Sequence, residues 1–420
     1  MNRKYLRPKD EIKSSLKVST IEGSWWAVMY GTVETYFSAF FEHLRYSSYE
    51  ISVLMTFPVF FGAIFQNLSQ NFHKILKSRK RLITILKLMQ TLTIPIIFYV
   101  GYSGGNYLLL ISFICIYYAI AISQMAPWTS WMGYLVPGRL RGKYFGNRSQ
   151  VVRVFMLISS LIAGSILNAY NNNEAMTGFA IIFLVGMLAN IGSTFYITKQ
   201  FEPSEDVIDE NVVIGNEDSL EHKLKKFIAY DSISEFAFSI SGPLMMIYWI
   251  RDLNFSYIEI AVLLNVSQLV GLFSLRYWGS KIDQNGTIST IRWSSLAIGI
   301  FPLFWILILF LPAQLRLASS LVVASLAALM FSGRALAMDN RLYEHMNGKN
   351  MIKTTSRRVF YKGLFIFVGG FLGGTLTRTE FIDLGQHAFF NNHIHIVFAT
   401  SAVFRILVWG LYLGKSKIKI

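Results

Sequence analysis

The residue with the clearest chemical potential is Glu34, a carboxylic acid inside an otherwise apolar run, WWAVMYGTVE, that starts at Trp25. An apolar stretch of about 20 residues crosses a bilayer as a helix. A charge at the bilayer centre costs on the order of 3 kcal/mol, so it needs a partner, water or a function. In a regular helix Tyr30 lies one turn before Glu34 and Ser38 one turn after it, on the same face. Glu34 could therefore exchange a proton or bind a cationic group; the alternative is a protonated, hydrogen-bonded structural residue.

Other polar side chains in apolar runs are further candidates for solute or ion binding. Asp231 and Glu235 are spaced i, i+4 and share one helix face. They could guide a cation or anchor salt bridges, although the start of a helix favours acids through its dipole. Asn265 and Gln268 could hydrogen-bond a solute, but they are better explained as bonds between helices. Trp26 belongs to an abundant aromatic set that either lines a cavity or marks the membrane interface.

The elements that position these side chains are long apolar helices. Of the 420 residues, 53% are hydrophobic and 15% are charged, whereas a soluble domain carries about 25% charge. Transmembrane strands would be about half as long and would alternate apolar with polar residues. The chain is therefore predicted to be an all-α polytopic membrane protein with 12 transmembrane helices. The predicted spans are 21–43, 49–69, 82–103, 106–126, 147–169, 175–197, 227–250, 256–275, 287–311, 315–338, 359–377 and 393–414.

The distribution of Lys and Arg predicts the orientation, because these residues gather in alternate segments between the spans. The protein is predicted to lie in the cell membrane, and the positive-inside rule places both of its termini in the cytoplasm. The net charge of +15 favours an anionic membrane surface as partner, and no nucleic-acid-binding motif is present. The expected partners are a small-molecule substrate, protons or a cation, and membrane lipid, with the protein as a monomer.

No cofactor or metal is expected. The single cysteine, Cys115, excludes an intramolecular disulfide and a thiol-based metal site. His387, His393 and His395 fall in a predicted outer loop, where an ordinary polar loop is a better explanation than a metal site. The sequence holds no P-loop, so ATP is not expected to drive the protein directly.

The two halves of the chain resemble each other at an offset of about 209 residues. Tyr49–Leu54 matches Ile258–Leu263, and Ala163–Leu167 matches the Gly373–Leu376 segment, each pair in equivalent predicted helices. At this offset Asp231 matches Glu22. The predicted domains are a cytoplasmic tail (1–20), a six-helix bundle (21–198), a cytoplasmic linker (199–226), a second six-helix bundle (227–414) and a second tail (415–420).

Two loops carry a resemblance to the major facilitator superfamily. Gly279, Asp283 and Gly286 match its G-x-x-x-D-x-x-G loop between the eighth and ninth helices. The segment with Arg141 and Arg148 is similar to the P-x-x-x-R-G-x-[YF]-F-G segment of many bacterial members. The resemblance implies two pseudo-symmetric bundles around a central site, with the first helix of each half lining it, and a gating role for these five residues.

The sequence departs from the family pattern in two places. The first copy of the loop motif, within 70–82, keeps the basic residues without the Gly and Asp positions. Residues 157–167 lack the Gly-Pro signature of drug/proton antiporters, which disfavours multidrug efflux.

These features predict a secondary active transporter that works by alternating access, coupled to protons or ions through Glu34 or Glu235. The alternatives are a lipid flippase or a non-transporting sensor on the same fold. An intramembrane enzyme is disfavoured because neither H-E-x-x-H nor G-x-S-x-G occurs.

Overall fold

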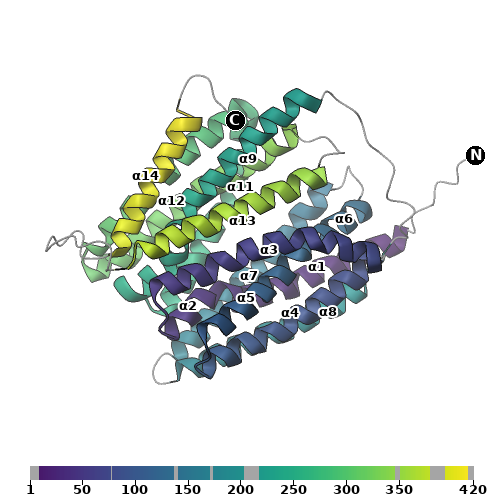
Figure 1. Ribbon diagram of the computed structural model, residues 1–420, viewed down its shortest axis with the longest axis horizontal. Coiled ribbons are helices and arrows are strands. Elements are labelled where there is room, and N and C mark those ends of the chain that lie inside the picture. Colours follow the sequence, from purple (N-terminus) through teal and green to yellow (C-terminus); the bar gives the residue numbers. More distant parts are fainter. Residues whose placement is uncertain are drawn as a thin grey trace, which may run out of the picture. The chain divides into compact units, whose positions relative to one another are not determined.

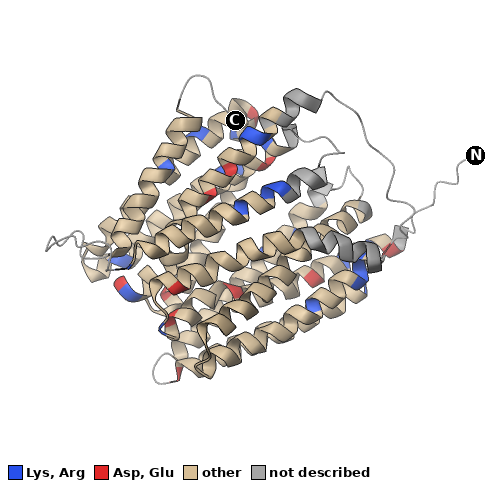
Figure 2. Ribbon diagram, viewed as in Figure 1, with Lys and Arg blue, Asp and Glu red and all other residues tan. Residues whose placement is uncertain are grey.

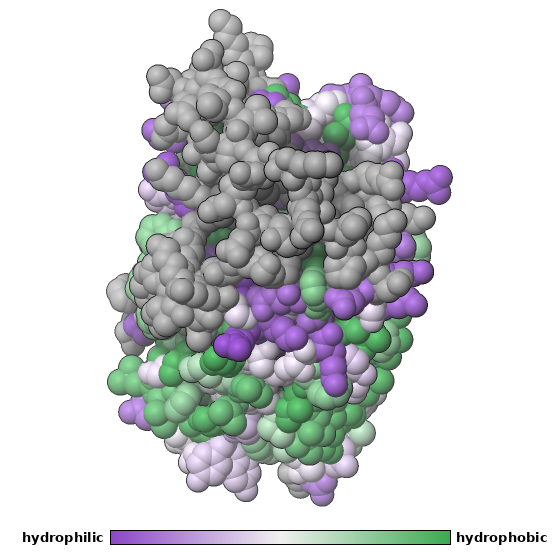
Figure 3. Space-filling view, turned by 90° about the vertical axis from the view of Figure 1, so that its right-hand side faces the viewer, coloured by the Kyte–Doolittle hydropathy of each residue, from purple (hydrophilic) through white to green (hydrophobic). Residues whose placement is uncertain are grey.

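The computed structural model describes residues 9–76, 78–136, 141–170, 174–202, 217–345, 351–378 and 393–414, and within them it contains helices and no strand (Figure 1). The all-α prediction is confirmed. Most positions along the described helices are uncharged (Figure 2). On the face drawn in Figure 3, hydrophobic side chains cover a broad area beside a hydrophilic band. Such a pattern is typical of a surface that passes from hydrocarbon into water.

Nine of the described helical segments are long and apolar enough to cross a membrane. The chain is therefore a multi-pass membrane protein. One segment, α11 (Tyr257–Leu309), contains both spans that the sequence places between 256 and 311. It departs from helical geometry at Gly286, where φ is +79°, a backbone conformation that glycine adopts without a steric penalty. The count of twelve spans stays a prediction.

The chain forms two compact units, residues 1–37 with 61–210 and residues 38–60 with 211–420. Residues 38–60 thus belong to the second unit, and the division into bundles at 21–198 and 227–414 stays a prediction. The first unit contains α1 (Lys9–Thr32), η1 (Glu34–Tyr36), the second part of α3 (Ser48–Leu76), α4 (Arg79–Tyr102), α5 (Tyr107–Ser123), α6 (Met125–Leu135), α7 (Arg141–Ala169) and α8 (Ala175–Thr198). The second contains most of α2 (Phe37–His43), the first part of α3, α9 (Glu217–Ser239), η4 (Gly242–Leu244), α10 (Met245–Ile247), η5 (Tyr248–Asp252), α11, α12 (Ala313–His345), α13 (Met351–Thr375) and α14 (His393–Tyr412).

The first helix of each half is broken, at positions that the repeat makes equivalent. α1 ends at Thr32 and a 3₁₀ turn follows at Glu34–Tyr36, whereas α9 ends at Ser239 and a 3₁₀ turn follows at Gly242–Leu244. The predicted spans 21–43 and 227–250 each contain such a break. In the second half Pro243 supplies a local cause, because proline cannot donate a helix hydrogen bond. Breaks of this kind free backbone groups that other side chains must satisfy.

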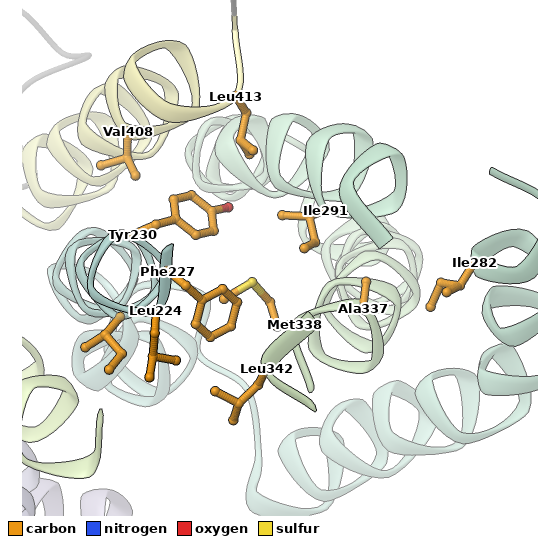
Figure 4. Packing of buried hydrophobic residues seen from close by; sticks show 11 residues of the cluster. Leu224, Phe227, Tyr230, Ile282, Ile291, Ala337, Met338, Leu342, Val408 and Leu413 are labelled. Atoms are coloured by element: carbon orange, nitrogen blue, oxygen red, sulfur yellow. The ribbon is translucent and has the colours of Figure 1, made fainter. Parts of the chain in front are cut away.

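The core of the second unit joins four of its long helices. Tyr230 and Phe227 from α9 pack with Ile291 from α11, Met338 from α12 and Leu413 beyond the end of α14, and all are buried (Figure 4). This packing fixes α9 against its neighbours and so determines where the polar side chains of α9 lie.

Four glycines allow α13 to approach two neighbouring helices of the second unit. Gly369 faces the backbone carbonyl of Phe236 on α9, and Gly373 faces that of Ile240 just after α9; Gly370 and Gly374 face α3. Ser52 Oγ on α3 donates a hydrogen bond to the carbonyl oxygen of Gly370 at 2.7 Å. In a membrane, small residues promote helix association because they let backbones come close.

Replacing Gly373 with Ala is expected to lower the stability of the chain by about 1–3 kcal/mol, because the added methyl group would meet the Ile240 carbonyl. Gly410→Ala on α14 is the matched control, since no other atom lies within 4 Å of the position its methyl group would take. Thermal unfolding of the two variants in detergent measures the difference. Equal stability of the two variants would contradict close packing at this position.

Candidate functional site

Glu34 lies at the first residue of the 3₁₀ turn that follows α1, and its side chain is half-buried. Its Oε1 accepts a hydrogen bond of 2.6 Å from the hydroxyl of Tyr117, a fully buried residue of α5. The Tyr117 hydroxyl also lies 3.2 Å from the sulfur of Met29 on α1. The helix break thus aims the carboxyl group at a hydroxyl from a different helix.

The surroundings of Glu34 are aromatic. Tyr117 contacts Tyr118 and Phe37 with ring centroids 5.6 and 5.5 Å apart. Among the described residues, no Lys or Arg forms a salt bridge with Glu34. A carboxyl group held by a neutral hydroxyl can gain or lose a proton without breaking an ion pair.

Two other predicted residues lie on the helix that carries Glu34. Trp26 and Tyr30 contact each other with ring centroids 5.4 Å apart, and both are half-buried on α1. The break in the helix interrupts the regular spacing that would place Ser38 on the same face, and Ser38 belongs to the second unit.

A network of charged side chains surrounds Glu22 on α1 in the first unit. Lys87 Nζ on α4 lies 3.0 Å from Glu22 Oε1, and Arg148 Nη2 on α7 lies 3.3 Å from Oε2. Ser193 Oγ on α8 donates to Glu22 Oε1 at 2.8 Å. The guanidinium of Arg148 also lies 4.6 Å from the ring centre of Trp128. The network around Glu22 therefore joins four helices of its unit.

The second unit repeats this arrangement around Asp231 on α9. Arg358 Nε on α13 donates to Asp231 Oδ2 at 2.7 Å. Lys362 Nζ lies 2.8 Å from Glu235 Oε1 and 3.7 Å from Asp231 Oδ2. Positions 148 and 358 are separated by about the repeat offset, so each unit pairs an acid of its first helix with an arginine of its fifth.

The remaining predicted residues do not join these clusters. Asn265 is buried, and its Nδ2 donates to the carbonyl of Ala261 on its own helix at 2.7 Å. Gln268 is half-buried on α11. Asp283 is exposed and forms no salt bridge within the described part of the chain. Asp283 lies within α11, and an exposed charged side chain of this kind is usually solvated.

Several residues named from the sequence lie inside a helix, at an element end or outside the description. Gly279 lies inside α11, and apart from its own helix no described atom lies within 4 Å of the position of a Cβ, so no close contact with the described residues requires glycine there. α7 begins at Arg141, and the side chain of Arg141 lies outside the described residues, as does His387. In the part of the chain that is described, no group of three or more metal-ligating side chains comes together.

The sequence did not identify Tyr117 as the partner of Glu34, whereas a backbone carbonyl within the second half was an expected partner of Arg405. Tyr117 was one of many aromatic residues, and nothing local marked it as the donor to Glu34. Arg405 on α14 donates from Nη1 to the carbonyl of Ile298 at 3.2 Å, and from Nη2 to Ser241 Oγ at 3.0 Å. Its Nη2 also lies 3.4 Å from the carbonyl oxygen of Phe238. Arg405 thus contacts the Phe238 carbonyl and the Ser241 hydroxyl at the break after α9, and the Ile298 carbonyl on α11.

No family model and no curated protein matches this sequence. Solved structures match nearly the whole chain. A mutant form of the nucleoside transporter NupG aligns with a TM-score of 0.72 at 10% identity, over 97% of this chain and 100% of the other. A bacterial homologue of the iron transporter ferroportin, inward-facing, gives 0.70 at 11%, over 96% and 98%. A D-xylose-proton symporter gives 0.70 at 13%, over 97% and 100%.

These similarities define the architecture. The chain has the fold of these solved transporters, in agreement with the resemblance to the major facilitator superfamily that the two loop motifs carry. Within this fold, the first helix of each half is broken, and each unit holds a network of ion pairs around an acid of that helix.

Proposed function

We propose that this protein is a secondary active transporter that moves a small solute across the cell membrane and couples the movement to protons through Glu34. The single observation that carries the proposal is the Glu34 carboxyl group, half-buried at a helix break and bound by the Tyr117 hydroxyl at 2.6 Å. In transporters built from inverted or parallel repeats, discontinuous helices form the substrate and ion sites. The fold supports transport as the activity, because the chain resembles transporters of several solutes over almost its full length.

The proposed mechanism is alternating access. Protonation of Glu34 removes a charge from membrane depth, which lowers the cost of passing through a state closed to water. Loss of the proton on the other side resets the carboxylate, and Tyr117 offers it a hydrogen bond in the charged form. A proton gradient would then bias the direction of the cycle.

Several features complete the proposal. In this proposal the chain works as a monomer without a cofactor. Both termini are cytoplasmic, as the distribution of basic residues predicts. The alternatives are a lipid flippase, a non-transporting sensor and an intramembrane enzyme. Solute flux that is coupled to protons through Glu34 distinguishes the proposed transporter from them.

Solute flux in proteoliposomes tests the proposal. The purified chain is reconstituted with an imposed pH gradient and supplied with labelled sugars, nucleosides, amino acids, carboxylates, organic cations and lipids. We expect accumulation of one class above its equilibrium level, which collapses when a protonophore removes the gradient. Flux that equilibrates without accumulation would refute proton coupling, and absence of flux for every class would refute transport.

A further inference from the structure

We propose that a group of cationic side chains around Phe238 in the second unit binds an anionic group, a carboxylate or phosphate, on the transported solute. The inference rests on the proposed transport function and adds the chemical class of the solute. It is built from Arg334 on α12 and Arg405 on α14, which approach the same aromatic residue of α9.

Arg334 is the residue best suited to hold the anion. Its side chain is 7% exposed, and its Nε and Nη2 have no hydrogen-bond partner among the described residues. The guanidinium lies 4.8 Å from the ring centre of Phe238 and 5.7 Å from that of Tyr230. Aromatic faces attract a guanidinium without using its N–H donors, so those two donors remain available for a ligand.

The acid nearest to Arg334 is already engaged by other cations. Arg334 Nη2 lies 3.9 Å from Asp231 Oδ1, beyond hydrogen-bond distance, whereas Arg358 Nε lies 2.7 Å from Oδ2. Lys362 lies 3.7 Å from the same carboxylate and 2.8 Å from Glu235. Asp231 is therefore shared among several cations and does not neutralise Arg334 alone.

The balance of charge in this part of the second unit is positive. Asp231 and Glu235 are the acids of α9 that form the described ion pairs here, and the only other acid in those pairs is Asp339, which is 62% exposed. The cations that face these acids or Phe238 are Arg334, Arg358, Lys362 and Arg405.

Arg405 increases the excess of positive charge. Its guanidinium lies 5.0 Å from the ring centre of Phe238, its Nη atoms bond uncharged oxygens, and its Nε has no partner among the described residues. Two guanidinium groups thus share one aromatic ring, and neither is hydrogen-bonded to an acid in the described contacts. A buried charge whose hydrogen-bond donors are not all paired is costly, and an anion from outside the chain would offset that cost.

The chemistry of arginine narrows the ligand further. A guanidinium presents its donors in a planar fork that matches two oxygens of a carboxylate or phosphate. The proposed proton on Glu34 fits such a solute, because a proton moving with an anion reduces the net charge carried across the membrane.

Matched ligand pairs in a thermal-shift titration of the full-length chain test the inference. The probes are succinate against butane-1,4-diol, glucose 6-phosphate against glucose, and inorganic phosphate as the free anion, all at one ionic strength. A ligand that binds the folded state raises the unfolding temperature. We expect an anionic probe to raise it in a saturable way, and its uncharged analogue to have no effect.

Variants of Arg334 separate binding from folding. Arg334→Gln is expected to weaken binding of the anion about tenfold or more, and Arg334→Lys to weaken it less, because lysine keeps the charge and loses the fork. Arg357→Gln, at the exposed neighbour of Arg358 on α13, is the control and should bind as the unmodified chain does. If Arg334→Gln does not fold, Arg334→Lys decides the result.

The inference is overturned if no anionic probe stabilises the chain more than its uncharged analogue, or if Arg334→Lys and Arg334→Gln both keep full affinity. Neither of these outcomes affects the flux experiment, because a transporter of uncharged solutes would still accumulate its substrate. Stabilisation by inorganic phosphate alone would mean that the site binds a free inorganic anion, and this result would also overturn the assignment to an organic solute.

Discussion

Glu34→Gln is expected to abolish solute accumulation driven by a pH gradient while leaving the chain folded in the membrane. Glutamine keeps the size of the side chain and can accept the Tyr117 hydrogen bond, but it cannot exchange a proton. Downhill exchange of the solute should persist, because the substitution mimics the protonated state. The measurement compares accumulation and exchange of the solute identified in proteoliposomes.

The control for this prediction is Glu174→Gln, which removes an exposed carboxyl group from the residue before α8 in the same unit. It should transport as the unmodified chain does. Tyr117→Phe should slow accumulation about tenfold, by loss of a hydrogen bond to a charged group, and retain its dependence on the gradient. Unchanged, pH-dependent accumulation by Glu34→Gln would remove Glu34 from the mechanism.

Glu22→Gln is expected to destabilise the first unit by about 3 kcal/mol, because it leaves a buried cation without its counter-charge. Lys87 is 4% exposed, and in the described contacts its ammonium faces Glu22 and Ser193. Adding Lys87→Met removes that uncompensated charge and should restore most of the lost stability. Arg148 is closer to water and contacts Trp128, so it tolerates the change better.

Thermal unfolding in detergent measures both variants against Glu11→Gln, which alters an exposed acid on the same helix. The control should unfold as the unmodified chain does. A double variant that is less stable than Glu22→Gln alone would show that Lys87 is stabilised by something other than Glu22. The test also bears on the repeat, because Asp231 occupies the matching position in the second unit.

Apolar length and charge spacing were enough to predict the helices and much of their order. Each described long helix coincides with at least one expected span, since about 20 apolar residues can leave water only as a hydrogen-bonded helix. The offset that matched Glu22 with Asp231 also anticipated a structural relation: both acids pair with an arginine of the fifth helix of their half.

The broken helices were less visible in the sequence. Pro243 gave a signal in the second half, but Val33 to Tyr36 holds neither proline nor glycine, and the turn there is still 3₁₀. Tertiary packing accounts for the turn in the first half, because the Tyr36 hydroxyl donates a hydrogen bond of 2.7 Å to the carbonyl of Ser160 on α7. Interactions between residues so far apart in the chain leave no periodic trace in a single sequence.

The sequence by itself determined that this chain forms apolar helices long enough to cross a membrane, that its halves are related, and that Glu34 is an acid inside an apolar run. These properties follow from local composition, because the bilayer acts on each apolar segment separately. Only the tertiary structure decided that Tyr117 binds Glu34, that Lys87 and Arg148 neutralise Glu22, and that Arg334 keeps unpaired donors among the described residues. The partner of a buried charge depends on which helices pack together, and that is fixed by side-chain shape across the whole unit.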